Sequence, residues 1–172
     1  FTVYGPWGRP DMALFKFTKS ILSGQPIEVY NGGNMSRDFT YIDDLVDSIR
    51  LLIEASPGGK RDETAGIALI DSKSPVAPFR VVNIGNSNAV TLSDFILAIE
   101  TALGRKSEKK ILPMQSGDVP STQSDGSLLH ELTGQSPSKD LAAGVKSFTD
   151  WYQSNYDDKK GTLKIKEAIF EK

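Results

Sequence analysis

The sequence contains no cysteine and a single histidine, His130. The first absence excludes a disulfide framework, a thiolate nucleophile and a cysteine-based zinc site. The second excludes a metal site built from several histidines. Leucines surround His130 and predict a short helix, in which this residue has a structural or surface role. We therefore expect the chain to bind no metal ion.

The sequence also lacks a basic excess and a long apolar run. Its 20 Lys and Arg residues against 22 Asp and Glu residues give a formal net charge of −2. Proteins that bind nucleic acid through phosphates usually carry an excess of positive charge. No apolar stretch reaches the roughly 18 residues of a membrane-spanning helix, and no signal peptide is recognisable. These features favour a cytoplasmic protein that binds neither nucleic acid nor a membrane, and that holds any phosphate with a few placed arginines.

Segments with strand and helix patterns alternate along the chain, which predicts an α/β fold. Short runs bounded by Gly or Pro predict strands, and apolar residues at a helical period predict helices. The expected strands are 1–5, 27–30, 37–42, 80–84 and 108–113. The expected helices are 11–23, 44–55, 91–103, 127–133 and 141–154. Residues 56–79 are typical of a long surface loop.

Three of the helices carry recognisable start signals. Asp11 and Asp43 are candidate N-cap residues, and Thr91 with Asp94 forms a capping-box pattern in which Asp replaces Glu. In the helix after Asp43, the apolar spacing predicts a buried face made of Leu45, Ile49, Leu52 and Ile53.

The strands are short and few for a self-sufficient sheet, and the chain opens without Met at Phe1, already in strand-like sequence. We therefore expect a domain of residues 1–156 that completes its sheet on a partner domain. A charged tail of residues 157–172 should follow it and fray.

The first candidate site follows the first strand, where Thr2-Val3-Tyr4-Gly5-Pro6 precedes Arg9. The end of a strand at a turn is a common place to present side chains to a cleft. Arg9 lies between this turn and a helix start, where its planar guanidinium could pair with a carboxylate or phosphate. The alternative is an arginine that faces solvent.

The second candidate site runs from Ile27 to Asp43. A Gly-rich turn at 31–34 permits close backbone approach or positive φ, and Arg37 could point back over it. Together they would form a cradle for a diphosphate, and Tyr30 could stack on a base. The alternative is an ordinary hairpin in which a surface arginine pairs with Asp38.

The third candidate site is the turn Gln115-Ser116-Gly117-Asp118, which could aim the Asp118 carboxylate at ribose hydroxyls. Such a turn is also ordinary loop chemistry. No G-x-G-x-x-G follows a strand in the sequence, so the chain contains no dinucleotide fingerprint. The only Tyr-x-x-x-Lys pair, Tyr156 with Lys160, lies in the charged tail, where we interpret it as a chance occurrence.

Taken in order, these motifs resemble those of the extended short-chain dehydrogenase/reductases, and among them the UDP-glucuronate 4-epimerases. The resemblance covers about residues 1–156. The matching stretches are Thr2-Val3-Tyr4-Gly5-Pro6, Arg9-Pro10-Asp11-Met12-Ala13, Arg37-Asp38-Phe39-Thr40-Tyr41-Ile42-Asp43-Asp44, Val82-Asn83-Ile84-Gly85 and Gly117-Asp118-Val119.

The resemblance implies the C-terminal, substrate-binding part of a Rossmann-type fold whose N-terminal NAD-binding part is missing. Family members oxidise C4 of a UDP-sugar with NAD, rotate the keto intermediate and return the hydride, and their catalytic Tyr-x-x-x-Lys pair would lie upstream of Phe1. The resemblance also implies a homodimeric parent protein. It places the substrate at Thr2, Arg9, Val29, Tyr30, Arg37, Gln115 and Asp118.

Gln115 departs from the pattern of the UDP-galactose 4-epimerases, which carry a second diphosphate arginine there. Two other readings stay open at this point. The chain could be the substrate domain of another NAD-dependent sugar-nucleotide epimerase or dehydratase, or a non-catalytic nucleotide-binding module.

Overall fold

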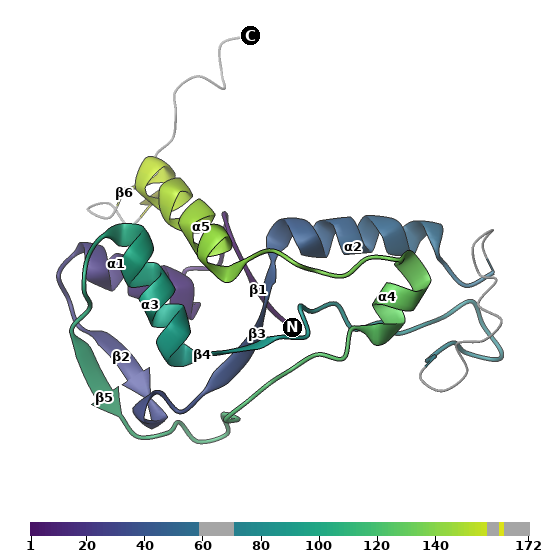
Figure 1. The fold of residues 1–172 in the computed structure, drawn as a ribbon, viewed down its shortest axis with the longest axis horizontal. Helices are drawn as coiled ribbons and strands as arrows, with labels where there is room; N and C mark the ends of the chain where they lie inside the picture. Colours follow the sequence, from purple (N-terminus) through teal and green to yellow (C-terminus); the bar gives the residue numbers. More distant parts are fainter. Residues whose placement is uncertain (59–70, 158–161, 164–172) are drawn as a thin grey trace, which may run out of the picture.

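The computed structural model describes residues 1–58, 71–157 and 162–163, and it confirms an α/β fold (Figure 1). Its first half contains β1 (Thr2–Tyr4), α1 (Ala13–Leu22), β2 (Ile27–Tyr30), the 3-10 turn η1 (Asn31–Gly33), β3 (Ser36–Tyr41) and α2 (Ile42–Glu54). Its second half contains β4 (Ala89–Thr91), α3 (Leu92–Leu103), β5 (Lys109–Leu112), α4 (Ser127–Thr133), α5 (Leu141–Asn155), β6 (Tyr156–Asp157) and β7 (Thr162–Leu163).

Strand β3 is shared between two kinds of pairing. Its last three residues, 39–41, run parallel to β1, while its first three, 36–38, run antiparallel to β4. Strands β2 and β5 form a separate parallel pair, with Ile27 opposite Lys109. The turn η1 therefore carries the chain from one sheet to the other, and the alternative of a hairpin between 27–30 and 37–42 is wrong. Among the described residues, the second edge of β1 has no strand beside it.

The core lies where α1, α3 and α5 pack together beside the strands (Figure 1). Phe95 and Ile99 of α3 meet Val145, Phe148 and Tyr152 of α5, and all five side chains are at most 1% exposed. Burying aromatic and branched side chains of this size is the main stabilising contribution available to such a domain.

Residues 80–84 do not form the predicted strand. The backbone there is irregular, and the strand that follows it in the chain is β4, at 89–91. The β-branched pattern of this segment favours an extended backbone, but a strand also requires a neighbour to pair with. In place of strand pairing, the amino group of Phe1 donates a hydrogen bond to the carbonyl of Ile84 (3.3 Å), and the Val81 N–H donates to the Ser72 hydroxyl (2.9 Å).

Helix α2 has an uncovered apolar face, contrary to expectation. Ile49 and Ile53 are 47% and 70% exposed, and Val46, one turn earlier, is 55% exposed. These three residues recur at i, i+3 and i+7 and so share one side of the helix. We call them the α2 stripe. Leu45 and Leu52 are half-buried as predicted.

The helix starts differ in how far the sequence predicts them. Thr91 caps α3 by accepting a hydrogen bond from the Asp94 backbone N–H, and Gly104 ends this helix in the left-handed conformation, as predicted. Asp11 does not cap α1, because its carboxylate pairs with Arg9 and the helix begins after Met12. Asp43 lies within the first turn of α2, where its charge still favours the helix N-terminus.

The predicted tail is partly ordered, since β6 pairs antiparallel with β7. Residues 59–70 of the predicted loop, and the rest of the tail, lie outside the described residues. In the part of the chain that the structure describes, no helix is long and apolar enough to cross a membrane. His130 lies exposed on α4, 3.3 Å from the Ser136 hydroxyl.

Candidate functional site

A cavity of about 240 Å³ lies between β2, β3, α1 and the start of α3. Its polar groups come from β1, β2, β3 and the loop that contains Asp118, and many of its apolar groups come from α1 and α3. The lining residues are Thr2, Met12, Ala13, Phe17, Glu28, Tyr30, Met35, Ser36, Arg37, Phe39, Val90, Leu92, Phe95 and Asp118. A concave, mostly apolar site with a few convergent polar groups is typical of small-molecule binding.

Phe39 fixes the apolar wall of this cavity. Its ring stacks on Phe95 at 4.3 Å between centroids, with an interplanar angle of 11°. It also meets the ring of Tyr4 edge to face at 5.9 Å. Because Phe39 follows Arg37 by two residues on β3, both side chains lie on the same face of the strand. The strand thus presents a flat apolar ring and a cation to one cavity.

Arg37 provides the positive charge of the cavity. Its guanidinium donates to the Asp118 carboxylate (2.7 Å) and to the carbonyl oxygens of Ser36 (2.8 Å) and Pro120 (3.2 Å). The Arg37 side chain is 22% exposed and that of Asp118 is 35% exposed, so both remain accessible from the cavity. A guanidinium in this setting can bind a diphosphate by charge-assisted hydrogen bonds.

Asp118 reaches Arg37 through the turn that the sequence indicated. The Asp118 backbone N–H donates to the Gln115 carbonyl (3.3 Å), and Gly117 has φ +83°, a conformation that favours glycine. The cradle differs from the one predicted, because residues 31–34 do not line the cavity and the partner of Arg37 comes from the 118–120 loop. The Asp38 alternative is also wrong, since Asp38 is fully buried on the opposite face of β3.

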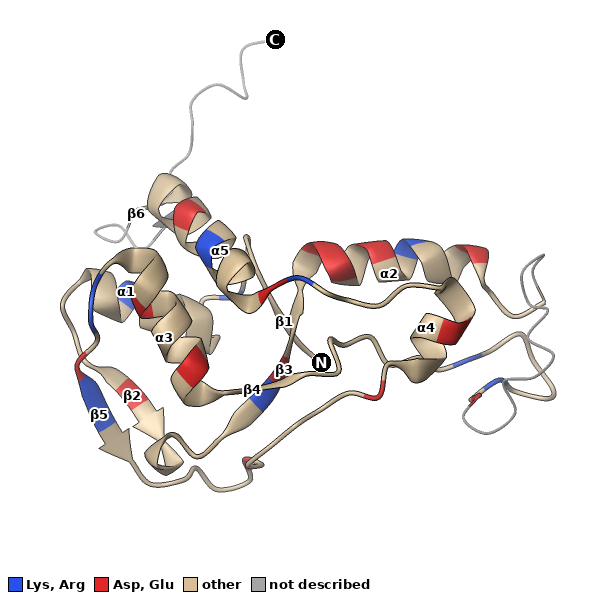
Figure 2. Cartoon of the chain, viewed as in Figure 1, with Lys and Arg blue, Asp and Glu red and all other residues tan. Residues whose placement is uncertain are grey.

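Strand β2 contributes alternate residues to the cavity. Tyr30 and Glu28 line it, and the Tyr30 hydroxyl donates to the Glu28 carboxylate (3.1 Å), an interaction that raises the pKa of Tyr30. Val29 points the other way, and its side chain is 3% exposed within the core. Of the two predicted residues on this strand, the structure therefore brings Tyr30 to the cavity but not the Val29 side chain. The Lys110 ammonium nitrogen of β5 lies 3.6 Å from a Glu28 carboxylate oxygen, so a positive charge lies beside β2 (Figure 2).

Thr2 and Arg9 lie around a second hollow of about 380 Å³, formed by residues 1–9, Met12 and Ile42. Thr2 and Met12 line both hollows, which are therefore adjacent. The Arg9 guanidinium is held by Asp11, with Nε 3.1 Å from one carboxylate oxygen, and the pair lowers the pKa of Asp11. Both side chains are more than half exposed, so this pairing is open to exchange for another carboxylate.

Gln115 does not reach the main cavity. Its side chain is exposed and lines a neighbouring depression of about 490 Å³ that also contacts Lys16 and Lys19 of α1. The depression shares Ala13, Phe17, Glu28 and Tyr30 with the main cavity. Gln115 therefore lies beside the candidate site, on the outer side of Tyr30.

Several lining residues were not predicted from the sequence, among them Glu28, Ser36 and Phe39. A signal for two of them was present. Strand alternation places Glu28 with Tyr30 and Phe39 with Arg37, so each predicted residue identifies its neighbour two positions away. Ser36 had no such signal, because its contacts are to Ser121 and the backbone of 120–122, far along the chain.

Comparison with known proteins points to one family. Residues 1–68 match the NAD dependent epimerase/dehydratase family. The chain is 51% identical over 156 residues to a probable UDP-glucuronate 4-epimerase of Rhizobium meliloti, covering 91% of this chain and 46% of that protein. It is 42% identical over 160 residues to UDP-glucuronate 4-epimerase 1 of Arabidopsis thaliana, covering 91% of this chain and 36% of that protein.

The fold is shared with solved structures of such enzymes. The UDP-glucuronic acid 4-epimerase of Bacillus cereus, in complex with UDP-glucuronic acid and NAD, matches with a TM-score of 0.72 and 29% identity, over 90% of this chain and 43% of that one. The UDP-glucose 4-epimerase of Thermotoga maritima matches in fold with a TM-score of 0.71 at 24% identity, over 89% of this chain and 44% of that one. The chain spans less than half the length of these relatives.

Proposed function

Because the chain shares its sequence and fold with the NAD dependent epimerase/dehydratase family, we propose that it is the UDP-sugar-binding part of a UDP-glucuronate 4-epimerase. The complete enzyme would interconvert UDP-glucuronate and UDP-galacturonate. The observation that carries the proposal is the Arg37–Asp118 pair in a cavity whose other walls are aromatic and aliphatic.

Each group of the cavity has a role that fits one part of a UDP-sugar. Arg37 would bind the diphosphate, Asp118 would accept hydrogen bonds from the ribose hydroxyls, and Tyr30 would stack on the uracil. The adjacent hollow would take the sugar, where Thr2 offers a hydroxyl. Arg9 would exchange Asp11 for the glucuronate carboxylate, since an exposed pair of this kind contributes little to stability.

The described residues do not fit the cofactor in the same way. None of the described helices begins after a G-x-G-x-x-G turn, which is the usual cradle for the pyrophosphate of a dinucleotide. NAD would therefore be bound mainly by the N-terminal part of the complete protein. Its own part in catalysis is to bind the nucleotide, orient the sugar and neutralise the diphosphate charge.

The first test is UDP binding to the 172-residue chain by isothermal titration calorimetry. Arg37→Ala should weaken binding roughly ten- to a hundred-fold, because it removes charge-assisted hydrogen bonds. Arg50→Ala is the matched control, since Arg50 lies exposed on α2 and its ion pairs among the described residues are with Asp47 and Glu54 of the same helix. An equal loss in both variants, or no loss in either, would contradict the assigned role of Arg37.

A second test separates this enzyme class from its relatives. In the chain joined to the upstream half of a relative, Arg9→Ala should weaken UDP-glucuronate binding and leave UDP-glucose binding unchanged. Equal affinity for dTDP-glucose would instead favour another NAD-dependent epimerase or dehydratase. Nucleotide binding without sugar discrimination would favour a non-catalytic module.

A further inference from the structure

Asp38 is a fully buried carboxylate directly behind the candidate site. It accepts hydrogen bonds from the backbone N–H groups of Asn86 (3.1 Å), Ser87 (3.0 Å) and Ser124 (2.9 Å). The Ser124 hydroxyl donates to it as well. Asp38 is 0% exposed, so these four donors take the place of the water that would otherwise solvate its carboxylate.

These donors belong to two loops that are distant in sequence. Residues 85–87 and Ser124 nevertheless lie against each other beside Asp38, since the Ser87 N–H also donates to the Ser124 hydroxyl (3.2 Å). The approach is close, because a Cβ added at Gly85 would lie 2.2 Å from the Ser124 hydroxyl oxygen. Asp38 thus clamps both loops against the strand.

The loop that ends at Ser124 is the one that holds Arg37. Its Pro120 carbonyl accepts from the Ser36 N–H (2.9 Å), and its Thr122 N–H donates to the Ser36 carbonyl (3.2 Å). The same loop begins with Asp118, the ion-pair partner of Arg37. One end of the loop is therefore fixed by Asp38, and the other end fixes the guanidinium in the cavity.

We propose that Asp38 is a positioning residue for nucleotide binding. It holds the 118–124 loop on β3 so that Arg37 and Asp118 keep the geometry that a diphosphate and a ribose require. Asp38 itself touches no ligand, because its side chain lies on the far face of the strand from the cavity. This inference rests on the proposed function, since it assigns the cavity to a nucleoside diphosphate.

The test compares uridine and UDP binding in Asp38→Asn. The amide can still accept from the Ser124 side, but its NH2 group then faces the Asn86 N–H, so the clamp is weakened without a change of shape. We expect UDP affinity to fall roughly ten-fold, and uridine affinity, which would depend on Asp118 but not on Arg37, to fall by a smaller factor of roughly two to three. Equal losses for both ligands, or unchanged UDP affinity, would overturn the proposal.

Glu100→Gln is the matched control, because Glu100 is a second buried carboxylate with several donors, away from the cavity lining. It should leave UDP affinity unchanged wherever the variant is folded. In an Arg37→Ala background, Asp38→Asn should lower UDP affinity no more than it lowers uridine affinity, because the larger part of its effect acts through Arg37. An additive effect would contradict this route.

Hydrogen exchange supplies a readout that needs no ligand. The amides of Ser36 and Thr122 should exchange faster in Asp38→Asn than in the unchanged chain, and not faster in Glu100→Gln. If the unchanged chain fails to bind UDP, the proposed function is overturned and this exchange result alone decides the role of Asp38. If Asp38→Asn does not fold, Ser124→Ala, which removes a single donor, should produce the same changes to a smaller extent.

Discussion

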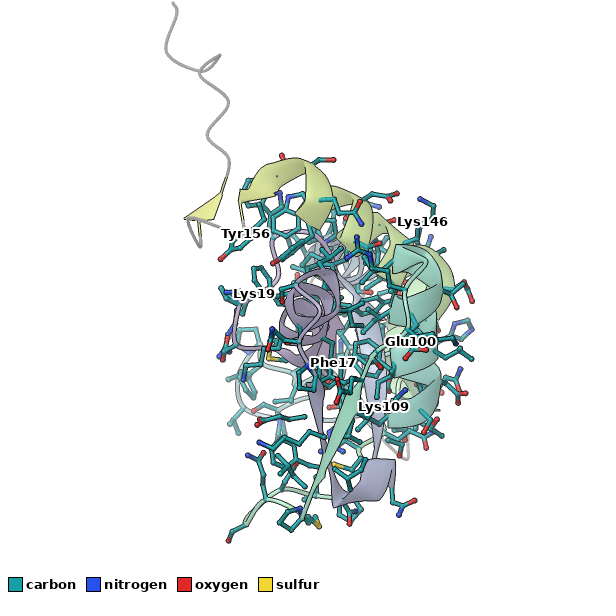
Figure 3. The ribbon with its side chains drawn as sticks, turned by 90° about the vertical axis from the view of Figure 1, so that its left-hand side faces the viewer. Phe17, Lys19, Glu100, Lys109, Lys146 and Tyr156 are labelled. Carbon is teal, nitrogen blue, oxygen red and sulfur yellow. The ribbon has the colours of Figure 1, made fainter. Side chains whose placement is uncertain are left out.

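At the scale of single residues, the buried carboxylate of Glu100 is expected to contribute to the response of the chain to acid. It accepts from the Ser107 N–H (3.0 Å) and hydroxyl (2.6 Å) and from the ammonium groups of Lys109 (3.1 Å) and Lys106 (3.2 Å). Figure 3 shows Glu100 on α3 directly beside Lys109 of β5. Burial alone raises the pKa of Glu100, but the hydrogen bonds outweigh it and lower that pKa to about 2.

The sign of the pH effect follows from this lowered pKa. The stabilisation by Glu100 is fully present above its ordinary pKa of 4.5 and is lost as the pH falls toward about 2. We expect the loss to be on the order of 2 kcal/mol. Urea unfolding between pH 7 and pH 3 measures this loss. The free energy of unfolding should fall less over this range (the acid limb) for Glu100→Gln than for the unchanged chain. Asp150→Asn, at an exposed ion pair with Lys146, is the control for the removal of a surface carboxylate.

At the scale of elements, Gly144 sets how closely α5 approaches β1. A Cβ at this position would lie 2.3 Å from the Tyr4 hydroxyl oxygen and 2.8 Å from two ring carbons. The Tyr4 ring has little room to move, because it packs edge to face against Phe39 and Tyr41. The same burial raises the pKa of Tyr4, with smaller contributions from Asp140 and Asp44.

Gly144→Ala should therefore destabilise the fold by about 1–3 kcal/mol, through overpacking. The sign of this change in the free energy of unfolding is informative, because replacing Gly by Ala in a helix interior otherwise stabilises a protein by about 1 kcal/mol. Chemical denaturation of the variant measures the change. Ser154→Ala on the exposed side of α5 is the control for helix propensity, and it should be neutral or slightly stabilising. A more stable Gly144→Ala variant would mean that the close packing on Tyr4 is absent.

The elements also show what the sequence could predict. The helix before Gly104 and the strands at 1–5, 27–30 and 37–42 depend on caps, turns and alternation, which are local, and they were predicted to within a few residues. Segment 80–84 failed because its β-branched residues indicate an extended backbone but not a partner strand. Arg37 was predicted as a ligand-binding residue, but its partner is 81 residues away, where no local pattern reveals it.

At the scale of the whole molecule, the α2 stripe is a largely exposed apolar face, and among the described residues the second edge of β1 has no strand beside it. Val46, Ile49 and Ile53 are nonetheless arranged as a buried helix face would be, which is why the sequence pattern predicted burial for two of them. The relatives are more than twice as long as the matched region. We expect this face to be where the chain meets the remainder of the parent fold.

The exposure of the α2 stripe predicts different stability costs for truncating Ile53, which lies in the stripe, and Ile99, which lies in the core. Ile53→Ala should cost less than about 1 kcal/mol in this chain, because a side chain that is 70% exposed gives up little buried area. Ile99→Ala should cost about 2–5 kcal/mol, because Ile99 lies on α3 and is fully buried in the core that α3 forms with α5. Thermal unfolding of both variants measures the difference. In a complete parent protein, the Ile53→Ala cost should rise toward the Ile99→Ala value.

The shared strand β3 has a consequence for the order of events during synthesis. Arg37 and Asp38 leave the ribosome first, whereas their partners Asp118 and Ser124 follow 81 and 86 residues later. At about 5–20 residues per second, that interval lasts roughly 4–17 seconds. Throughout this time the nascent chain exposes an unpaired arginine and an unpaired carboxylate on one strand. The nucleotide cavity is therefore assembled late in translation, and a chain released before residue 124 would have the aromatic wall but not the closed site.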